Sequence, residues 1–250
     1  MMPTKSLRLG SVRVDRVDIR ETLELIETFI GERTPHRIVT VNLEYLRHAH
    51  SDPSFRAALD AADLAVADGM PLVWLSRLFR RPLRERIAGV DLADRCAWLA
   101  SIKGYRLFLL GAGAGVAQST AEVLRERYPG LAVAGTYTPP LGEFSAAEER
   151  RIEAAIAAAQ PDILLVALPT PRQELWNHAN ARRWNVPVVI GVGAAFDMLS
   201  GEVRRAPAWM QRSGFEWLFR LVREPRRLWK RYLVHDTAIL FHILKSRVAS

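Results

Sequence analysis

The sequence predicts an α/β protein built on a buried parallel sheet. Three observations lead to this fold class. Short apolar segments alternate with longer segments that carry charges at helical spacing, which is typical of strands covered by helices on both faces. Polar and glycine residues follow the apolar segments. The chain has 250 residues and a hydrophobic share of 49%, enough for the core of one large domain.

We expect about six strands in a Rossmann-like parallel sheet flanked by helices. In chain order they are the segments 37–42, 64–68, 105–113, 131–137, 162–169 and 186–193. The intervening segments 117–128 and 145–159 show helical spacing and charge. No internal repeat or low-complexity linker interrupts the series, so the alternation continues through most of the chain.

The last fifth of the chain is basic and predicts a C-terminal helical appendage. The net charge is +8, and residues 201–250 hold eleven Lys and Arg against four Asp and Glu, a net charge of +7. The basic side chains near helical spacing are Arg220, Arg223, Arg227 and Lys230. Pro225 should divide this segment into two helices, because proline suits the first turn of a helix. We therefore divide the chain into a core, residues 1–201, and a basic amphipathic appendage, residues 202–250, of the kind that lies on membrane surfaces.

Polar and glycine residues at the strand ends predict a ligand crevice. They are Thr40 and Asn42, Asp68, Gly111 to Gly113, Pro169 to Gln173, and Gly191 to Asp197. The carboxyl ends of parallel strands meet at one edge of a sheet, where such folds bind ligands. Asp68 is the most informative of these residues, because a carboxylate at the end of a buried strand is costly unless its charge is used.

One motif resembles a cofactor site and another resembles a metal site, but both are weak evidence for such a site. The turn GAGAGV, residues 111–116, resembles the dinucleotide-binding G-x-G-x-x-G, but Val116 replaces the third glycine and no acid ends the next strand. A nicotinamide-dependent oxidoreductase stays an alternative that rests on this turn alone. His48 and His50 are two residues apart and should face different sides of a helix. The sequence has no D-x-D motif, so we expect no metal and no cofactor.

A second alternative is a non-catalytic module that binds a membrane surface through the basic appendage. Nucleic acid is not an expected partner, because the sequence has no recognisable nucleic-acid-binding motif and its basicity is confined to the appendage.

The cysteine content and the hydropathy of the chain bear on its location. The single cysteine, Cys96, excludes a disulfide framework. The first residues lack the apolar region of a signal peptide, and no uncharged stretch reaches the roughly 18–20 residues of a spanning helix. These features predict a cytoplasmic location.

Several segments together resemble the WecG/TagA/CpsF glycosyltransferase family. They are TVN (40–42), ADGMPLVW (67–74), RIAGVDL (86–92), YRLFLLGAG (105–113), YPGLAVAGTYTPPLGEF (128–144), PTPRQELW (169–176), GVGAAFDMLSGEVRRAPAW (191–209) and EWLFRLVREPRR (216–227). They follow the order of the family across residues 35–230. Their combination is far more specific than any one segment.

The resemblance implies an inverting transfer from a UDP-sugar, such as UDP-N-acetylmannosamine, its uronate, or UDP-glucose. The implied acceptor is a polyprenyl-diphosphate-linked saccharide, and the products serve cell-surface polysaccharides such as exopolysaccharides. The enzyme is then expected to be peripheral on the inner face of the cell membrane, in contact with its anionic surface. Self-association is left open.

The resemblance also assigns roles to residues. Asp68 matches the acid of the family's D-G motif and would be the general base that takes the proton of the acceptor hydroxyl. Arg86 would neutralise the departing diphosphate. The residues implied to bind substrate are Thr40 and Asn42 for the sugar or acceptor, Gln173 for the donor, Asp197 for the nucleotide, and Arg220, Arg223 and Arg226 for closure of the appendage over the site.

Overall fold

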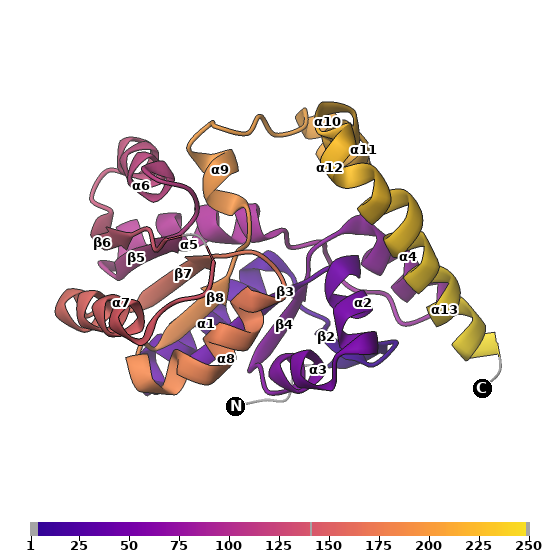
Figure 1. Ribbon diagram of the computed structural model, residues 1–250, viewed down its shortest axis with the longest axis horizontal. Helices are drawn as coiled ribbons and strands as arrows, with labels where there is room; N and C mark the ends of the chain where they lie inside the picture. Colours follow the sequence, from indigo (N-terminus) through magenta and orange to yellow (C-terminus); the bar gives the residue numbers. More distant parts are fainter. Residues whose placement is uncertain (1–4, 141, 249–250) are drawn as a thin grey trace.

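A six-stranded parallel sheet forms the centre of the protein in a computed structural model that describes residues 5–140 and 142–248 (Figure 1). The strand order is β4-β3-β8-β7-β5-β6. The strands are β3 (His36–Val41), β4 (Leu64–Ala67), β5 (Arg106–Gly111), β6 (Ala132–Tyr137), β7 (Ile163–Ala167) and β8 (Val188–Gly191). Each overlaps one of the six segments predicted from the apolar runs, so the predicted fold class is confirmed.

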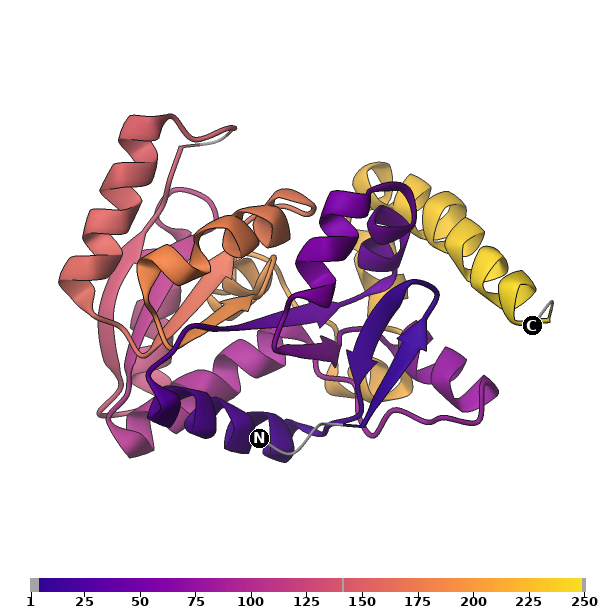
Figure 2. The same ribbon diagram turned by 90° about the horizontal axis from the view of Figure 1, so that it is seen from below.

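Helices cover both faces of this sheet. One face packs against α1 (Ile19–Glu32), α5 (Gly89–Lys103), α6 (Val116–Arg127) and α9 (Ala195–Leu199). The other face packs against α2 (Leu43–Ser51), α3 (Pro53–Asp60), α7 (Ala146–Ala159) and α8 (Arg172–Trp184). In Figure 2, α1 and α5 lie below the sheet, and α8 and α2 lie above it. Strands enclosed in this way are apolar at nearly every position, which made them visible in the sequence.

An antiparallel hairpin precedes the sheet and was not predicted. It consists of β1 (Ser6–Leu9) and β2 (Val12–Asp15), joined at Gly10, whose φ is +59°. The buried side chains of the hairpin are Leu7, Leu9, Val12 and Val14. Apolar and polar residues alternate along both strands, which is the signal of a hairpin with one covered face.

The C-terminal segment, residues 202–248, is helical as predicted. It contains α10 (Ala208–Ser213), α11 (Glu216–Arg223), α12 (Pro225–Trp229), a π-helical stretch η1 (Lys230–His235) and α13 (Asp236–Val248). Pro225 is the first residue of α12, directly after the break that ends α11, which confirms its predicted effect. In Figure 1, α12 to α13 form a long yellow helix at one end of the molecule.

This segment packs on the core. The side chains of Leu228, Ile239 and Ile243 are at most 5% exposed, and the last two join the cluster formed by the hairpin and α2. A Cβ atom on Gly10 would lie 3.4 Å from Cγ1 of Ile243, so α13 closes over the hairpin turn. Within the described part of the chain, no helix combines the length and the apolar character needed to cross a bilayer.

Candidate active site

A cavity of about 1260 Å³ lies at the carboxyl ends of the central strands. The turns after β3, β4, β7 and β8 line it, together with α2, α4 (Met70–Leu78) and the C-terminal segment. The predicted site residues that line it are Thr40, Asn42, Asp68, Arg86, Asp197 and Arg220. Those that do not are Gln173, Arg223 and Arg226. The predicted crevice is therefore present, and the C-terminal segment forms part of its wall.

Asp68 is the residue that follows β4. Its backbone N–H donates to the carbonyl of Val41 at 2.7 Å, which continues the pairing of β4 with β3. Gly69 then turns the chain with φ of +131°, a backbone conformation that L side chains rarely adopt, and α4 begins. One carboxylate oxygen of Asp68 lies 3.5 Å from the backbone nitrogen of Gly89. The strand end and the glycine turn thus hold the carboxylate at the cavity.

Burial raises the pKa of Asp68 to about 6 from an ordinary value of 3.8. The positive charge of Arg86 and the N–H of Gly89 oppose this rise, Glu216 adds to it, and Arg220 lowers the pKa slightly. The carboxylate is therefore mainly ionised at neutral pH. It is also a stronger base than an exposed aspartate, so it suits proton abstraction from a hydroxyl group.

Arg86 belongs to an ion-pair cluster that joins the core to the C-terminal segment. Its Nη1 lies 2.8 Å from Oε2 of Glu216, and its Nη2 lies 3.4 Å from Oδ2 of Asp91. Arg205 pairs with the same two carboxylates, at 2.5 and 2.8 Å from Asp91 and 3.2 Å from Glu216. Arg86 and Asp91 come from the core, whereas Arg205 and Glu216 come from the C-terminal segment. Arg86 thus lines the cavity with its charge already shared by two carboxylates.

Thr40 and Asn42 lie at the end of β3 and each has a structural bond. The hydroxyl of Thr40 donates to the carbonyl of Gly191 at 2.9 Å, which links β3 to the end of β8. The side-chain oxygen of Asn42 caps α2 by accepting from the N–H of Tyr45 at 3.2 Å. Asp197, half-buried, lies in the first turn of α9. Hydrogen bonds thus hold Thr40 and Asn42 at the cavity, and Asp197 lines it from α9.

Gln173 lies beneath the cavity wall, which differs from its predicted contact with a donor. Its side chain is 0% exposed, and its oxygen accepts from the N–H groups of Leu168 and Gly193 at 3.1 and 3.0 Å. Its amide nitrogen lies within hydrogen-bond distance of the Tyr45 hydroxyl (3.1 Å) and of Glu174 (2.8 Å). This placement does not support direct donor contact. Gln173 instead ties together the turns after β7 and β8.

Tyr45 and Glu174 complete this buried network and were missed from the sequence. The Tyr45 hydroxyl donates to Oε1 of Glu174 at 2.7 Å, and burial raises the pKa of Glu174 and of Tyr45. A Cβ atom on Gly191 would lie 2.3 Å from Oε1 of Glu174, so only glycine fits there. In the sequence, the acidic residue next to Gln173 was the signal that could have indicated this network. Its partner Tyr45 is 129 positions away, which no local pattern reveals.

The cations of the C-terminal segment are only partly those predicted. Arg220 lines the cavity, and its Nε is buried without a hydrogen-bond partner among the described residues. Arg223 and Arg226 are exposed outside the cavity. Lys230 and Arg231, from the π-helical stretch, line it in their place, and Nη2 of Arg231 lies 3.0 Å from Oε2 of Glu44. Lys230 was visible as a member of the basic stripe.

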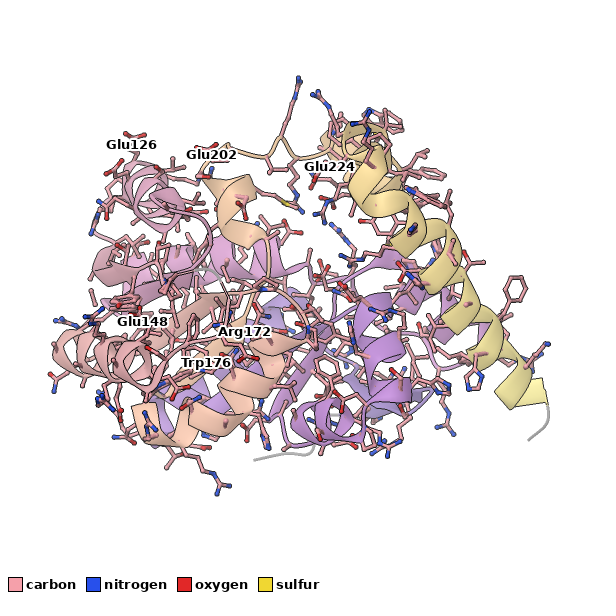
Figure 3. All side chains as sticks on the ribbon, viewed as in Figure 1. Glu126, Glu148, Arg172, Trp176, Glu202 and Glu224 are labelled. Atoms are coloured by element: carbon pink, nitrogen blue, oxygen red, sulfur yellow. The ribbon has the colours of Figure 1, made fainter. Side chains whose placement is uncertain are left out.

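Arg172 is another cation at the cavity that the site prediction omitted. It is the first residue of α8, and its guanidinium carbon lies 3.6 Å from the centroid of the Phe144 ring. Its Nη2 is buried with no hydrogen-bond partner in the described part of the chain. Figure 3 shows Arg172 and Trp176 about one turn apart on α8. A proline-bounded turn followed by a cation at a helix start was the sequence signal for this position.

The GAGAGV turn joins β5 to α6 and has a steric explanation. Gly111 has φ of +110°, and a Cβ atom there would lie 2.2 Å from the carbonyl oxygen of Ala167. The close approach of β5 and β7 therefore requires this glycine. Ala112 and Gly113 line the cavity. Among the described residues, no group of three or more His, Cys, Asp and Glu side chains is arranged to hold a metal ion.

The sequence was also compared with known proteins. The model of the glycosyl transferase WecG/TagA/CpsF family matches residues 7–250. Relatives from Bacillus spizizenii, Bacillus subtilis and Staphylococcus aureus are named N-acetylglucosaminyldiphosphoundecaprenol N-acetyl-beta-D-mannosaminyltransferase. Their identities to this chain are 35%, 34% and 27%, over 86%, 82% and 90% of this chain and 82%, 78% and 87% of theirs. These matches, which extend over most of the chain, show that it is a glycosyltransferase and belongs to the WecG/TagA/CpsF family.

Proposed function

We propose that this enzyme transfers a sugar, with inversion, from a UDP-sugar to a polyprenyl-diphosphate-linked saccharide. The observation that carries the proposal is Asp68, an ionised carboxylate of raised pKa at the edge of a cavity that also holds several cations. The names of the relatives favour an N-acetylmannosaminyl donor and an N-acetylglucosaminyl-diphosphoundecaprenol acceptor. The uronate donor and UDP-glucose are the alternatives. The oxidoreductase and the non-catalytic module are not proposed, because the chain belongs to a glycosyltransferase family.

The reaction is a single displacement. Asp68 takes the proton of the acceptor hydroxyl, and the hydroxyl oxygen forms a bond to the anomeric carbon of the donor. The bond between that carbon and the diphosphate breaks on the opposite face, and UDP leaves with the bonding electrons. Thr40 and Asn42 position the sugar or acceptor, and Asp197 contacts the nucleotide.

Cations at the cavity neutralise the charge of the leaving diphosphate. Arg220 lines the cavity and forms no ion pair among the described residues, whereas the guanidinium of Arg86 is shared with Glu216 and Asp91. We therefore assign the contact with the leaving group to Arg220. Arg86 keeps Glu216, and with it α11, at the cavity.

The C-terminal segment also contacts the membrane in this proposal. Residues 201–250 carry a net charge of +7, and each basic residue near an anionic leaflet gains about 1 kcal/mol. Large apolar side chains of the segment are exposed, among them Trp209, Val222 and Phe241. In Figure 3, Glu202 lies shortly after α9, and Glu224 lies where α11 ends and α12 begins. One segment would thus serve both the lipid surface and the cavity.

The proposed function predicts transfer from one UDP-sugar in a defined panel. The purified chain is incubated with N-acetylglucosamine linked to a short prenyl diphosphate and with UDP-N-acetylmannosamine, its uronate, UDP-glucose or UDP-N-acetylglucosamine. We expect UDP-N-acetylmannosamine to give the fastest transfer and a β-linked product, measured by mass spectrometry and by NMR of the anomeric centre. Retention of the donor configuration would reject the displacement, and absence of transfer from every donor would reject the function.

Transfer is expected to continue in the presence of EDTA. The reason is that Arg220 supplies positive charge where a divalent cation would otherwise balance the leaving diphosphate. The initial rate is measured with EDTA, and again after Mg²⁺ or Mn²⁺ is added in excess. Loss of the rate with EDTA and its recovery with either metal would show that Arg220 does not suffice.

A further inference from the structure

One end of the cavity is apolar on two facing helices. From α4 it is lined by Met70, Trp74, Leu75 and Leu78, and from η1 and α13 by Leu233, Leu240 and Leu244. On each helix these residues recur at helical spacing and so share one side of it. We call this part of the cavity the apolar groove. Both helices extend toward the same end of the molecule (Figures 1 and 2).

The walls of the groove are unusually exposed for apolar side chains. Trp74 is 42% exposed, Leu78 is 65% exposed and Leu233 is 55% exposed. Exposed apolar surface that gathers in one concave place, and not singly over the protein, is typical of a binding site. The protein therefore presents an open apolar channel, not a filled core, between α4 and α13.

Both walls change from polar to apolar in the same sequence direction. Asp68 immediately precedes the turn into α4, and Leu78 ends that helix about 12 Å further along its axis from Met70. On the facing wall, Lys230 and Arg231 come first and the apolar Leu233, Leu240 and Leu244 follow. The polar residues His235, Asp236 and Thr237 also line this wall, between Leu233 and Leu240. A molecule that spans the cavity would thus meet a base, then cations, then hydrocarbon side chains.

We propose that the apolar groove holds the hydrocarbon chain of the lipid-linked acceptor, specifically the prenyl units next to the diphosphate. The inference rests on the proposed function and adds a binding site for one part of the acceptor. The acceptor has a hydroxyl, a diphosphate and a prenyl chain in that order, which matches the order of groups along the cavity. The diphosphate lies at Lys230 and Arg231, and the chain leaves between Leu78 and Leu233.

The position of the groove selects this occupant over a loose acyl chain of the bilayer. The groove is continuous with the cavity that contains Asp68. A hydrocarbon covalently joined to the reacting saccharide is already held at that end, so its chain enters the groove without a separate loss of translational freedom. An acyl chain lacks the diphosphate that would use the cations at the junction.

The test compares two acceptors without bilayer or detergent. One carries N-acetylglucosamine on farnesyl diphosphate, and the other carries it on methyl diphosphate. The variants are Leu78→Ser and Leu233→Ser, with Ile102→Ser as control, because Ile102 is 56% exposed on α5 and does not line the cavity. All three replace an exposed side chain, so folding should be preserved. Circular dichroism and the unfolding midpoint check this.

We expect Leu78→Ser and Leu233→Ser each to raise KM for the farnesyl acceptor about tenfold, since each removes the burial of one large apolar side chain. KM for the methyl acceptor and for the UDP-sugar should stay unchanged, and Ile102→Ser should match the wild type throughout. Equal KM values of the wild type for both acceptors, or unchanged farnesyl KM in both groove variants, would overturn the proposal.

A binding measurement separates this inference from the proposed function. Farnesyl diphosphate alone is titrated calorimetrically into the wild type, Leu78→Ser and Ile102→Ser, and we expect about tenfold weaker binding only in Leu78→Ser. If the protein binds farnesyl diphosphate but transfers no sugar, the proposed function is rejected and the groove remains a prenyl-binding site. Binding of Leu78→Ser to anionic vesicles free of prenyl lipid is also measured. If the variant no longer binds these vesicles but still binds farnesyl diphosphate, the groove holds bilayer lipid and the proposal is overturned.

Discussion

Asp68→Asn should lower kcat by about 10²–10⁴-fold, the usual contribution of a positioned general base. Asparagine has the shape of aspartate and can still accept the N–H of Gly89, but it cannot take the proton of the acceptor hydroxyl. Affinity for UDP should change little, which isothermal titration calorimetry measures. Asp60→Asn is the matched control, because Asp60 is an exposed carboxylate at the end of α3, outside the cavity.

The pH profile distinguishes a base from a structural acid. The pKa of Asp68 is about 6, so kcat/KM of the wild type should fall about tenfold per pH unit below pH 6 as the carboxylate is protonated. The residual activity of Asp68→Asn should lack this limb. A profile with the same limb in the variant, or full activity of the variant, would exclude Asp68 as the base.

The same substitution should stabilise the protein. Folding raises the pKa of Asp68 from 3.8 to about 6. The stability of the folded state that this group contributes is therefore fully present below pH 3.8 and is lost as the pH rises through about 6. At neutral pH the buried charge therefore opposes folding, and Asn removes it. The free energy of unfolding should rise by up to about 3 kcal/mol in urea titrations. A large decrease would show that the carboxylate mainly holds the fold.

Removal of residues 202–250 should abolish transfer. The truncated chain lacks Arg220, and the loss of one such preorganised donor alone costs about 10²–10³-fold in rate. It also lacks the wall that closes the cavity and should no longer bind anionic liposomes. All six strands of the central sheet precede the cut, so the core should keep its sheet. Transfer at the full rate by the truncated chain would show that the segment serves only as an anchor.

Truncation also removes part of the core, so a point variant must accompany it. Leu228, Ile239 and Ile243 are buried, and each contributes about 1.5–3 kcal/mol when its burial is complete. Arg220→Gln keeps these contacts and should still lower kcat by about 10²–10³-fold in solution. Arg212→Gln is the control, since Arg212 is an exposed cation of the same segment outside the cavity. Equal rates for the two variants would remove Arg220 from the reaction.

The central sheet could be predicted from the sequence because its strands are enclosed on both faces and therefore apolar without interruption. The residues at their ends also indicated the crevice, as the placement of Thr40, Asn42 and Asp68 shows. The hairpin of β1 and β2 was missed because each strand has only four residues, too few for the alternation of polarity to stand out beside the long apolar runs. Local patterns thus predicted the central sheet and the residues of the site that lie at the strand ends.

Contacts between distant parts of the chain could not be predicted in the same way. The sequence places an arginine at position 86, but not its pairing with Glu216, 130 positions away. Gln173 was expected to face the donor, because its motif said nothing of the two backbone N–H groups that occupy its oxygen. The basic stripe contained Lys230, but the fold decided that Lys230 and Arg231, and not Arg223 and Arg226, line the cavity. The side chain of Arg227, another member of the stripe, lies outside the described part of the structure.

Proton uptake at Asp68 and docking of the C-terminal segment are linked equilibria. The ion pairs of Arg86 and Arg205 with Asp91 and Glu216 join the segment to the core beside Asp68. Docking brings Glu216, which raises the pKa of Asp68, and Arg220, which lowers it, to the same carboxylate. Linkage is reciprocal, so ionisation of Asp68 changes the docking free energy by the same amount that docking changes the free energy of ionisation. A change that alters the docking of this segment should therefore also alter the pKa of Asp68.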